Sequence, residues 1–239
     1  MVQFSKKEIG SMLIASLVLG LIFGYDDGQP VFIASRWFTN LVTMVLLSAI
    51  SLLIYASAQK IRAKKLGCEV TKGVWVIQRM SVTTSGYMKG PIKKMPFGVI
   101  LPLLLLFISK GVIKISAIMK TDISSKPTKR MSREWARAAD SEEAKIALAG
   151  PLITLLMGLM ATAFTSQIAA TFAAINLNLA LWNMLPIPTL DGSKVFFGSR
   201  LMFVFFFLMI LASYILARVV SPITAIILAV ILACVGMVT

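Results

Sequence analysis

The sequence of 239 residues contains no histidine. Histidine is the commonest metal ligand in proteins and the usual general base near neutral pH. Its absence excludes zinc sites built on imidazole, nucleophiles activated by histidine, and proton relays that pass through histidine. Cysteine is nearly absent as well, since Cys68 and Cys234 form neither a CxxC motif nor a disulfide framework.

Acidic residues are also scarce. Only 10 Asp and Glu stand against 24 Lys and Arg, which gives a net charge of +14. The chain is 58% hydrophobic, with a mean hydropathy of +0.86, and is too apolar for an ordinary soluble domain. The basic residues lie almost entirely between apolar segments, so membrane topology explains them better than nucleic-acid binding does. We therefore expect a lipid bilayer, and no nucleic acid, as a partner.

Six apolar segments are long enough to cross a bilayer. They cover residues 8–24, 38–58, 144–164, 169–186, 199–219 and 221–238. The first follows two lysines, as a signal peptide does, but no small-x-small cleavage site follows it cleanly, and we expect it to be retained. The sequence predicts an all-α polytopic membrane protein that forms a single integral membrane domain over residues 1–239.

The distribution of positive charge predicts the topology of these segments. With the N-terminus in the cytoplasm, the basic segment 59–95 also lies in the cytoplasm. If residues 96–118 crossed the membrane, the basic loop 120–145 would lie outside and would break the positive-inside rule. We therefore expect residues 96–118 to form a re-entrant element that protein or a wet cavity covers. Both termini are then cytoplasmic.

Two stretches have the composition of β-strands. Residues 68–87 are rich in Val, Thr and aromatic side chains, and residues 112–119 alternate between apolar and polar. Residues 74–82 and 112–119 therefore predict a small β-hairpin or sheet on the cytoplasmic side. We expect Lys110 and Lys114 to lie at the cytoplasmic mouth of the re-entrant element, where their side chains snorkel to the interface.

The polar segment 120–143 predicts a loop or a short amphipathic element. It carries Trp135 among basic residues, so an interfacial position and a solvated one are both open. The basic cytoplasmic surface sets the topology, and it could also hold anionic lipid or an acidic partner.

The segment "NLNLALWNMLPIPTLDG", residues 176–192, closes an apolar run with two prolines and a carboxylate. Pro-x-Pro bends or ends a helix and frees backbone carbonyls. Asp191 then lies near the cytoplasmic face, where an ionisable residue is a functional candidate. A plain interfacial turn, or a cap for the next helix, is the alternative.

The fuller pattern of this segment closely resembles the third conserved region of the site-2 protease family, the intramembrane zinc metalloproteases. In that family the segment supplies the aspartate that completes the zinc site. The matching residues here are Asn183, Pro186, Pro188, Leu190, Asp191 and Gly192. "AKIALAGPLITLLMG", residues 144–158, looks like the Ala-Gly-Pro helix of the family, with Gly150 and Pro151. "AKKLG", residues 63–67, resembles the tail of the zinc helix, and the resemblance covers about residues 38–195.

The zinc motif itself is missing. Counting back from "AKKLG", the positions of His-Glu-x-x-His read Tyr55-Ala56-Ser57-Ala58-Gln59. Neither Tyr55 nor Gln59 is a usual zinc ligand, and Ala56 has no titratable group where the general base should stand. A catalytic zinc needs about three protein ligands and an open position for water. We therefore expect no zinc, no other cofactor and no catalytic residue.

Asp191 is then a vestigial metal ligand with a structural role. We expect it to accept hydrogen bonds from freed backbone N–H groups, or from Asn183, Tyr55 or Gln59. Tyr55 and Gln59 are four residues apart, on one face of a helix. They would turn the former metal pocket into a polar network without metal.

Other hydrolytic sites fit the sequence poorly. A metal site that combined Cys68 or Cys234 with Asp191 would depart from the usual ligand sets. An aspartyl pair needs two carboxylates that share one site, and Asp191 has no acidic neighbour in the later spans. A Ser57–Lys60 pair would need a buried, neutral lysine.

The resemblance implies cleavage of transmembrane substrates, a lateral opening between helices, and a strand edge that holds an unwound segment. Without the metal, we expect a pseudoprotease that binds or scaffolds a segment of another membrane protein. An active intramembrane peptidase with an atypical site and a purely structural subunit are the alternatives. A transporter is disfavoured, because the chain shows no inverted repeat.

Overall fold

The computed structural model describes residues 3–26, 31–76, 95–125 and 140–217, together with Thr224, Ile227 and Ile231. Seven helices and two strands lie within the continuous described ranges. They are α1 (Lys6–Gly24), α2 (Ala34–Lys65), β1 (Cys68–Val74), α3 (Phe97–Ile108), β2 (Met119–Ser125), α4 (Asp140–Ala161), α5 (Gln167–Asn183), α6 (Asp191–Gly198) and α7 (Arg200–Leu216).

Three of these helices, α1, α2 and α4, are long and apolar enough to cross a membrane. The helix α7 is apolar but shorter, and α5 has 17 residues because it ends at Asn183, before the two prolines. The mostly helical, apolar fold is confirmed, whereas the six spans are not. The last expected span, 221–238, lies almost entirely outside the described residues.

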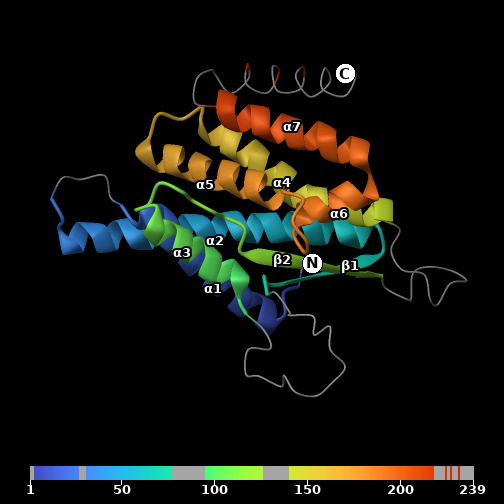
Figure 1. The fold of residues 1–239 in the computed structure, drawn as a ribbon, viewed down its shortest axis with the longest axis horizontal. Helices are drawn as coiled ribbons and strands as arrows, with labels where there is room; N and C mark the ends of the chain where they lie inside the picture. Colours follow the sequence, from blue (N-terminus) through green and yellow to red (C-terminus); the bar gives the residue numbers. More distant parts are fainter. Residues whose placement is uncertain are drawn as a thin grey trace, which may run out of the picture.

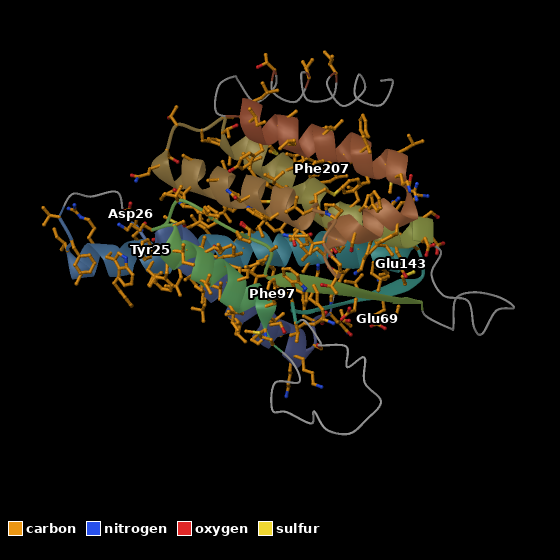
Figure 2. All side chains as sticks on the ribbon, viewed as in Figure 1. Tyr25, Asp26, Glu69, Phe97, Glu143 and Phe207 are labelled. Atoms are coloured by element: carbon orange, nitrogen blue, oxygen red, sulfur yellow. The ribbon has the colours of Figure 1, made fainter. Side chains whose placement is uncertain are left out.

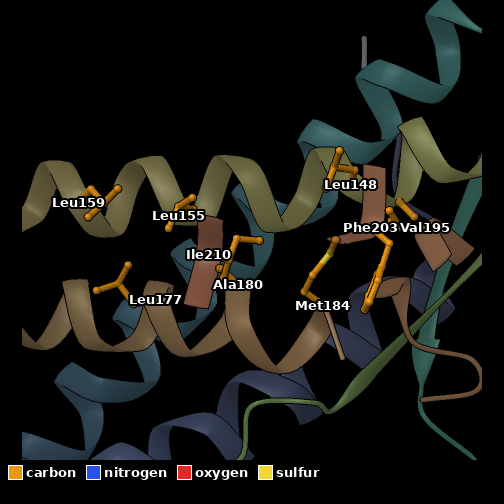
Figure 3. Close-up of a cluster of buried hydrophobic side chains, with 10 residues drawn as sticks. Leu148, Leu155, Leu159, Leu177, Ala180, Met184, Val195, Phe203 and Ile210 are labelled. Carbon is orange, nitrogen blue, oxygen red and sulfur yellow. The ribbon is translucent and has the colours of Figure 1, made fainter. Parts of the chain in front are cut away.

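The helices stack in layers around α2. In Figure 1, α1 and α3 lie on one side of α2, and α4, α5 and α7 lie on the other. Side chains from α4, α5, α6 and α7 form one buried apolar cluster (Figure 3). Its members include Leu148, Leu155, Leu159, Leu177, Ala180, Met184, Val195, Phe203 and Ile210.

The two strands pair antiparallel at one end of this stack. The register runs from Cys68 opposite Ser125 to Val74 opposite Met119. A small sheet is therefore confirmed, but the predicted strand boundaries are wrong. Residues 112–118 are not a strand, because pairing with β1 begins only at Met119. The start of the expected polar loop 120–143 forms β2 instead.

The expected β-hairpin within residues 68–87 is also corrected in part. The strand β1 ends at Val74, and its partner is β2, far along the chain. Residues 77–94 and 126–139, including Trp135, lie outside the described residues.

The chain reverses after α3. Lys110 and Gly111 have φ of 51° and 86°, in the left-handed region that favours glycine, and they turn residues 112–118 back toward β2. Lys114 Nζ lies 5.3 Å from the centroid of the Phe23 ring, at the C-terminal end of α1. Both lysines are thus at the opposite end of α1 from the sheet. They lie at or next to the turn of this element, and their expected position at its cytoplasmic mouth stays a prediction.

The same two ends are visible in Figure 2. Tyr25 and Asp26 lie at one end of the molecule, and Glu69 of β1 and Glu143 of α4 lie at the other. The segment 111–114 belongs to the Tyr25 end, since a Cβ on Gly111 would lie 3.0 Å from Cδ1 of Tyr25. The sheet end contains the candidate site.

Candidate functional site

Asp191 is the first residue of α6, and its side chain is directed at α2. It is 2% exposed. Tyr55 Oη donates a hydrogen bond to Oδ2 of Asp191, and Gln59 Nε2 donates to the same oxygen over 2.8 Å. The four-residue spacing of Tyr55 and Gln59 places both donors on one face of α2. The structure therefore brings together three residues that the sequence had singled out.

The Gly-Pro pair of α4 completes the surroundings of Gln59. Gln59 Nε2 also donates to the carbonyl of Ala147 over 2.8 Å. That carbonyl lacks its usual helical donor, because the residue four positions later is Pro151, which has no N–H. Gly150 provides the space, since a Cβ there would lie 2.5 Å from Cζ of Tyr55 and 2.9 Å from Nε2 of Gln59.

The loop between α5 and α6 places Asp191. Asn183 Nδ2 donates to the carbonyl of Leu179, one turn back in the same helix, over 2.9 Å. No hydrogen bond joins Asn183 to Asp191 among the described residues. Thr189 has a φ of 75°, which is strained for a β-branched residue. At Gly192 a Cβ would lie 2.2 Å from the carbonyl oxygen of Met184, so only glycine allows α6 to start this close to α5.

A lysine that sequence reasoning did not select also reaches this site. Lys72 Nζ donates to Oε1 of Gln59 and, over 2.7 Å, to Oγ1 of Thr121. It also lies 4.6 Å from the centroid of the Tyr55 ring, within the range of a cation–π contact. Gln59 thus uses its amide nitrogen on Asp191 and its amide oxygen on Lys72.

The sequence signal for Lys72 is the alternation of β1. Cys68, Val70 and Lys72 are buried, whereas Glu69 and Thr71 are exposed. Side chains two residues apart lie on the same face of a strand. The alternation places Lys72 on the buried face, whereas its charge alone groups it with the basic segment 59–95.

The electrostatics of Lys72 combine burial with several neighbouring charges. Burial lowers the pKa of Lys72 to about 8, and the carboxylate of Asp191 opposes this shift. Lys194 and Lys60 lower the pKa further, and Glu8 raises it. At neutral pH the side chain is an ammonium, in agreement with its two donated hydrogen bonds.

The polar network continues to α1 through Glu8. Lys60 Nζ lies 2.8 Å from Oε2 of Glu8 and donates to the carbonyl of Gln3 over 2.7 Å. The backbone N–H of Lys72 donates to Oε1 of Glu8 over 3.0 Å. Lys60 is therefore ion-paired, and this argues against a neutral lysine that would activate Ser57.

The donors around Asp191 do not fit a zinc ion. Zinc binds lone pairs of nitrogen, sulfur or oxygen. Tyr55 and Gln59 direct hydrogens at Asp191, and the amide oxygen of Gln59 faces an ammonium. Within the described ranges, no group of three or more His, Cys, Asp or Glu side chains is placed to hold a metal.

The cysteines are not placed to bind a metal ion together with Asp191 in the described part of the chain. Cys68 packs in a separate apolar cluster with Ala63, Val70 and Ile146. Cys234 lies outside the described residues.

A small cavity lies beside Ala56, where the family has its general base. About 10 Å³ of it can be reached by the centre of a water molecule, which is room for about one water. Its lining includes Ala56, Lys72, Ser116 and Asn183. The methyl group of Ala56 cannot polarise such a water.

The chain matches the family model of peptidase family M50 over residues 39–203. It belongs to this family, the site-2 proteases. The matched region contains Tyr55, Gln59, Gly150 and Asp191, whereas α1 precedes it. Comparisons with curated proteins and with solved structures returned no match. Family membership and the apolar helices together make this a site-2-protease-like membrane protein.

Proposed function

We propose that this member of the site-2 protease family does not cleave peptides and instead binds a membrane segment of another protein. The observation that carries the proposal is the network around Asp191. Tyr55 and Gln59 occupy the positions of the metal-binding histidines and donate to the carboxylate. Ala56 occupies the position of the general base and cannot take a proton.

A cleft away from Asp191 supports the binding role. It has a volume of about 500 Å³ and runs between residues 111–114, α5 and α7. Its polar lining comes from Lys114, Asn178, Trp182 and Tyr214. The cleft is large enough for side chains of a bound segment, and one cation in its wall would favour an acidic group in that segment.

Residues 112–114 form one wall of the cleft, in a segment that is neither helix nor strand. Val112 and Ile113 are exposed, whereas residues 115–118 are buried and lead into β2. Exposed apolar side chains in the wall of a cleft are contacts that a membrane segment could make. We therefore place the bound segment beside Val112 and Ile113.

The same proposal includes the topology. We infer six spans, cytoplasmic termini and a re-entrant element made of α3 and residues 112–118. The path of the chain supports the re-entrant element, since it leaves the sheet end, turns at Lys110 and Gly111, and returns to β2. Zinc and nucleic acid have no role in this proposal.

The alternative of an atypical peptidase has one observation in its favour. Ser116 and Lys72 line the same small cavity, as a Ser-Lys pair would. However, no hydrogen bond joins them within the described residues, and Lys72 donates to Gln59 and Thr121. Because the Lys72 side chain is engaged by Gln59 and Thr121, it is not positioned to take a proton from Ser116. The binding role fits better than either hydrolysis or a purely structural role, since the latter leaves the cleft unexplained.

Site-specific photocross-linking in native membranes tests the proposal. A photoreactive residue replaces Ile113 in the cleft wall, and in a matched variant it replaces Leu17 on α1; both side chains are about half exposed. We expect Ile113 to yield one discrete membrane-protein adduct of full length and Leu17 to yield none. Lys114→Glu should weaken the Ile113 adduct if the bound segment carries an acidic group. Equal adducts at both positions, or shortened partner fragments, would contradict a specific binding role without cleavage.

A further inference from the structure

Two charged side chains are buried beside each other in the site. Lys72 is 5% exposed and Asp191 is 2% exposed. A buried charge is costly unless a partner compensates it. The Gln59 amide joins the two, because its nitrogen donates to Asp191 and its oxygen accepts from Lys72.

We propose that the Lys72 ammonium supplies the positive charge that the metal ion supplies in the family, and that it thereby excludes a metal ion from Asp191. The protein would carry its cation on β1, as a fixed part of the chain. The proposal deepens the proposed function, because it explains how a site without metal keeps a buried carboxylate.

The position of the ammonium supports this role. Lys72 Nζ is held by Gln59 and Thr121 and lies over the ring of Tyr55, so it contacts both side chains that replace the histidines. A second cation stands on α6, three residues after Asp191. Lys194 Nζ is buried and has no hydrogen-bond partner among the described residues. Both charges repel a divalent cation at short range.

The chain allows a direct test, because two substitutions restore a histidine pair. Tyr55→His with Gln59→His places two imidazoles four residues apart and adjacent to Asp191, a set of three protein ligands for zinc. If Lys72 excludes the metal, this double variant should bind zinc weakly, and the addition of Lys72→Met should increase the affinity. The control is Lys120→Met in the same background, since Lys120 is on β2 but pairs with Asp122 at the surface.

Zinc affinity is measured on purified full-length protein by competition with a chelator of known affinity. We expect Lys72→Met to tighten binding at least about tenfold and Lys120→Met to leave it unchanged. In general, the repulsion between two charges about 4 Å apart near a protein surface exceeds the free energy of a tenfold change in affinity. Equal affinity with and without Lys72 would overturn the proposal.

A second measurement does not depend on the histidine variants. Lys72→Met and Asp191→Asn each leave one buried charge without its partner, whereas the two changes together remove both charges. The double variant should therefore lose clearly less in unfolding temperature, measured in detergent, than the sum of the two single variants. Additive losses would show that the two charges do not compensate each other.

The two proposals fail in different ways. One zinc per chain in purified wild-type protein, or partner fragments in the cross-linking experiment, contradicts the proposed function. Equal zinc affinities in the histidine variants contradict the role of Lys72 alone.

Discussion

The site around Gln59 and the apolar cluster of Figure 3 are equally well buried, but they are stabilised in different ways. Gln59 and Met184 are both 0% exposed. Met184 makes nondirectional contacts, which other side chains of similar volume can replace. Gln59 makes directional bonds to Asp191, Lys72 and Ala147, and each depends on the geometry of the others. The polar site should therefore be far less tolerant of substitution than the apolar cluster.

The largest expected difference in the free energy of unfolding is between substitutions of Gln59 and of Met184. Gln59→Leu keeps the volume but removes both bonds that connect Asp191 to Lys72, and we expect a loss of about 3–5 kcal/mol in the free energy of unfolding. Met184→Leu should cost less than about 1.5 kcal/mol. Denaturant unfolding in detergent, followed by tryptophan fluorescence, measures both. Similar losses for the two variants would remove the distinction.

A smaller difference in stability is expected between alanine substitutions at two glycines of α4, Gly150 and Gly158. A Cβ at Gly150 meets the Tyr55 ring, which a hydrogen bond to Asp191 holds in place. A Cβ at Gly158 meets the side chain of Leu177 at 2.8 Å, and the ends of a leucine side chain can move. Gly150→Ala should cost about 3 kcal/mol and Gly158→Ala about 1 kcal/mol.

Both glycine variants gain the same helix propensity, so their difference in unfolding temperature isolates the clash. A double variant tests whether the Tyr55 ring causes the loss of stability in Gly150→Ala. Tyr55→Phe combined with Gly150→Ala releases the ring from Asp191, and it should cost less than the sum of the two single changes. Full additivity would mean that the ring is not the obstacle.

The smallest effect is the dependence of stability on pH. The pKa of Lys72 falls from 10.5 to about 8 on folding. Between these pH values the unfolded chain binds a proton on Lys72 that the folded chain has released, so stability rises with pH. The gain in stability from the release of this proton is absent below pH 8 and fully present above pH 10.5. The wild-type unfolding temperature, taken relative to Lys72→Met at each pH, should increase across this window, and a flat difference would contradict the shift.

The sequence was sufficient for the helical face of the site but not for the strand that completes it. Tyr55, Gln59 and Asp191 follow from short motifs that resemble those of the site-2 proteases, and the four-residue spacing places Tyr55 and Gln59 on one helix face. The apolar lengths likewise predicted α1 and α4 closely. The helices depend on neighbours in the chain, so composition identifies them, whereas the site residues rest on the family resemblance.

The contact between Lys72 and Thr121 could not be predicted from local sequence. They meet only because β1 pairs with β2, and Lys72 is opposite Thr121 in a register between distant segments. The turn at Lys110 and Gly111 likewise carries Lys114 to the far end of α1. Register and turn direction depend on tertiary packing, so the alternation of residues 112–119 predicts a strand, whereas pairing with β1 begins only at Met119.

Glu8 has a consequence for how the protein is made. Besides the N–H of Ser5, its partners are Lys60 and the backbone of Lys72, which are synthesised 52 and 64 residues later. The first helix therefore leaves the ribosome with a carboxylate that nothing yet neutralises. The helix α1 can make its native contacts through Glu8 only after β1 has been synthesised. We therefore expect α1 to be among the last segments to adopt its native packing.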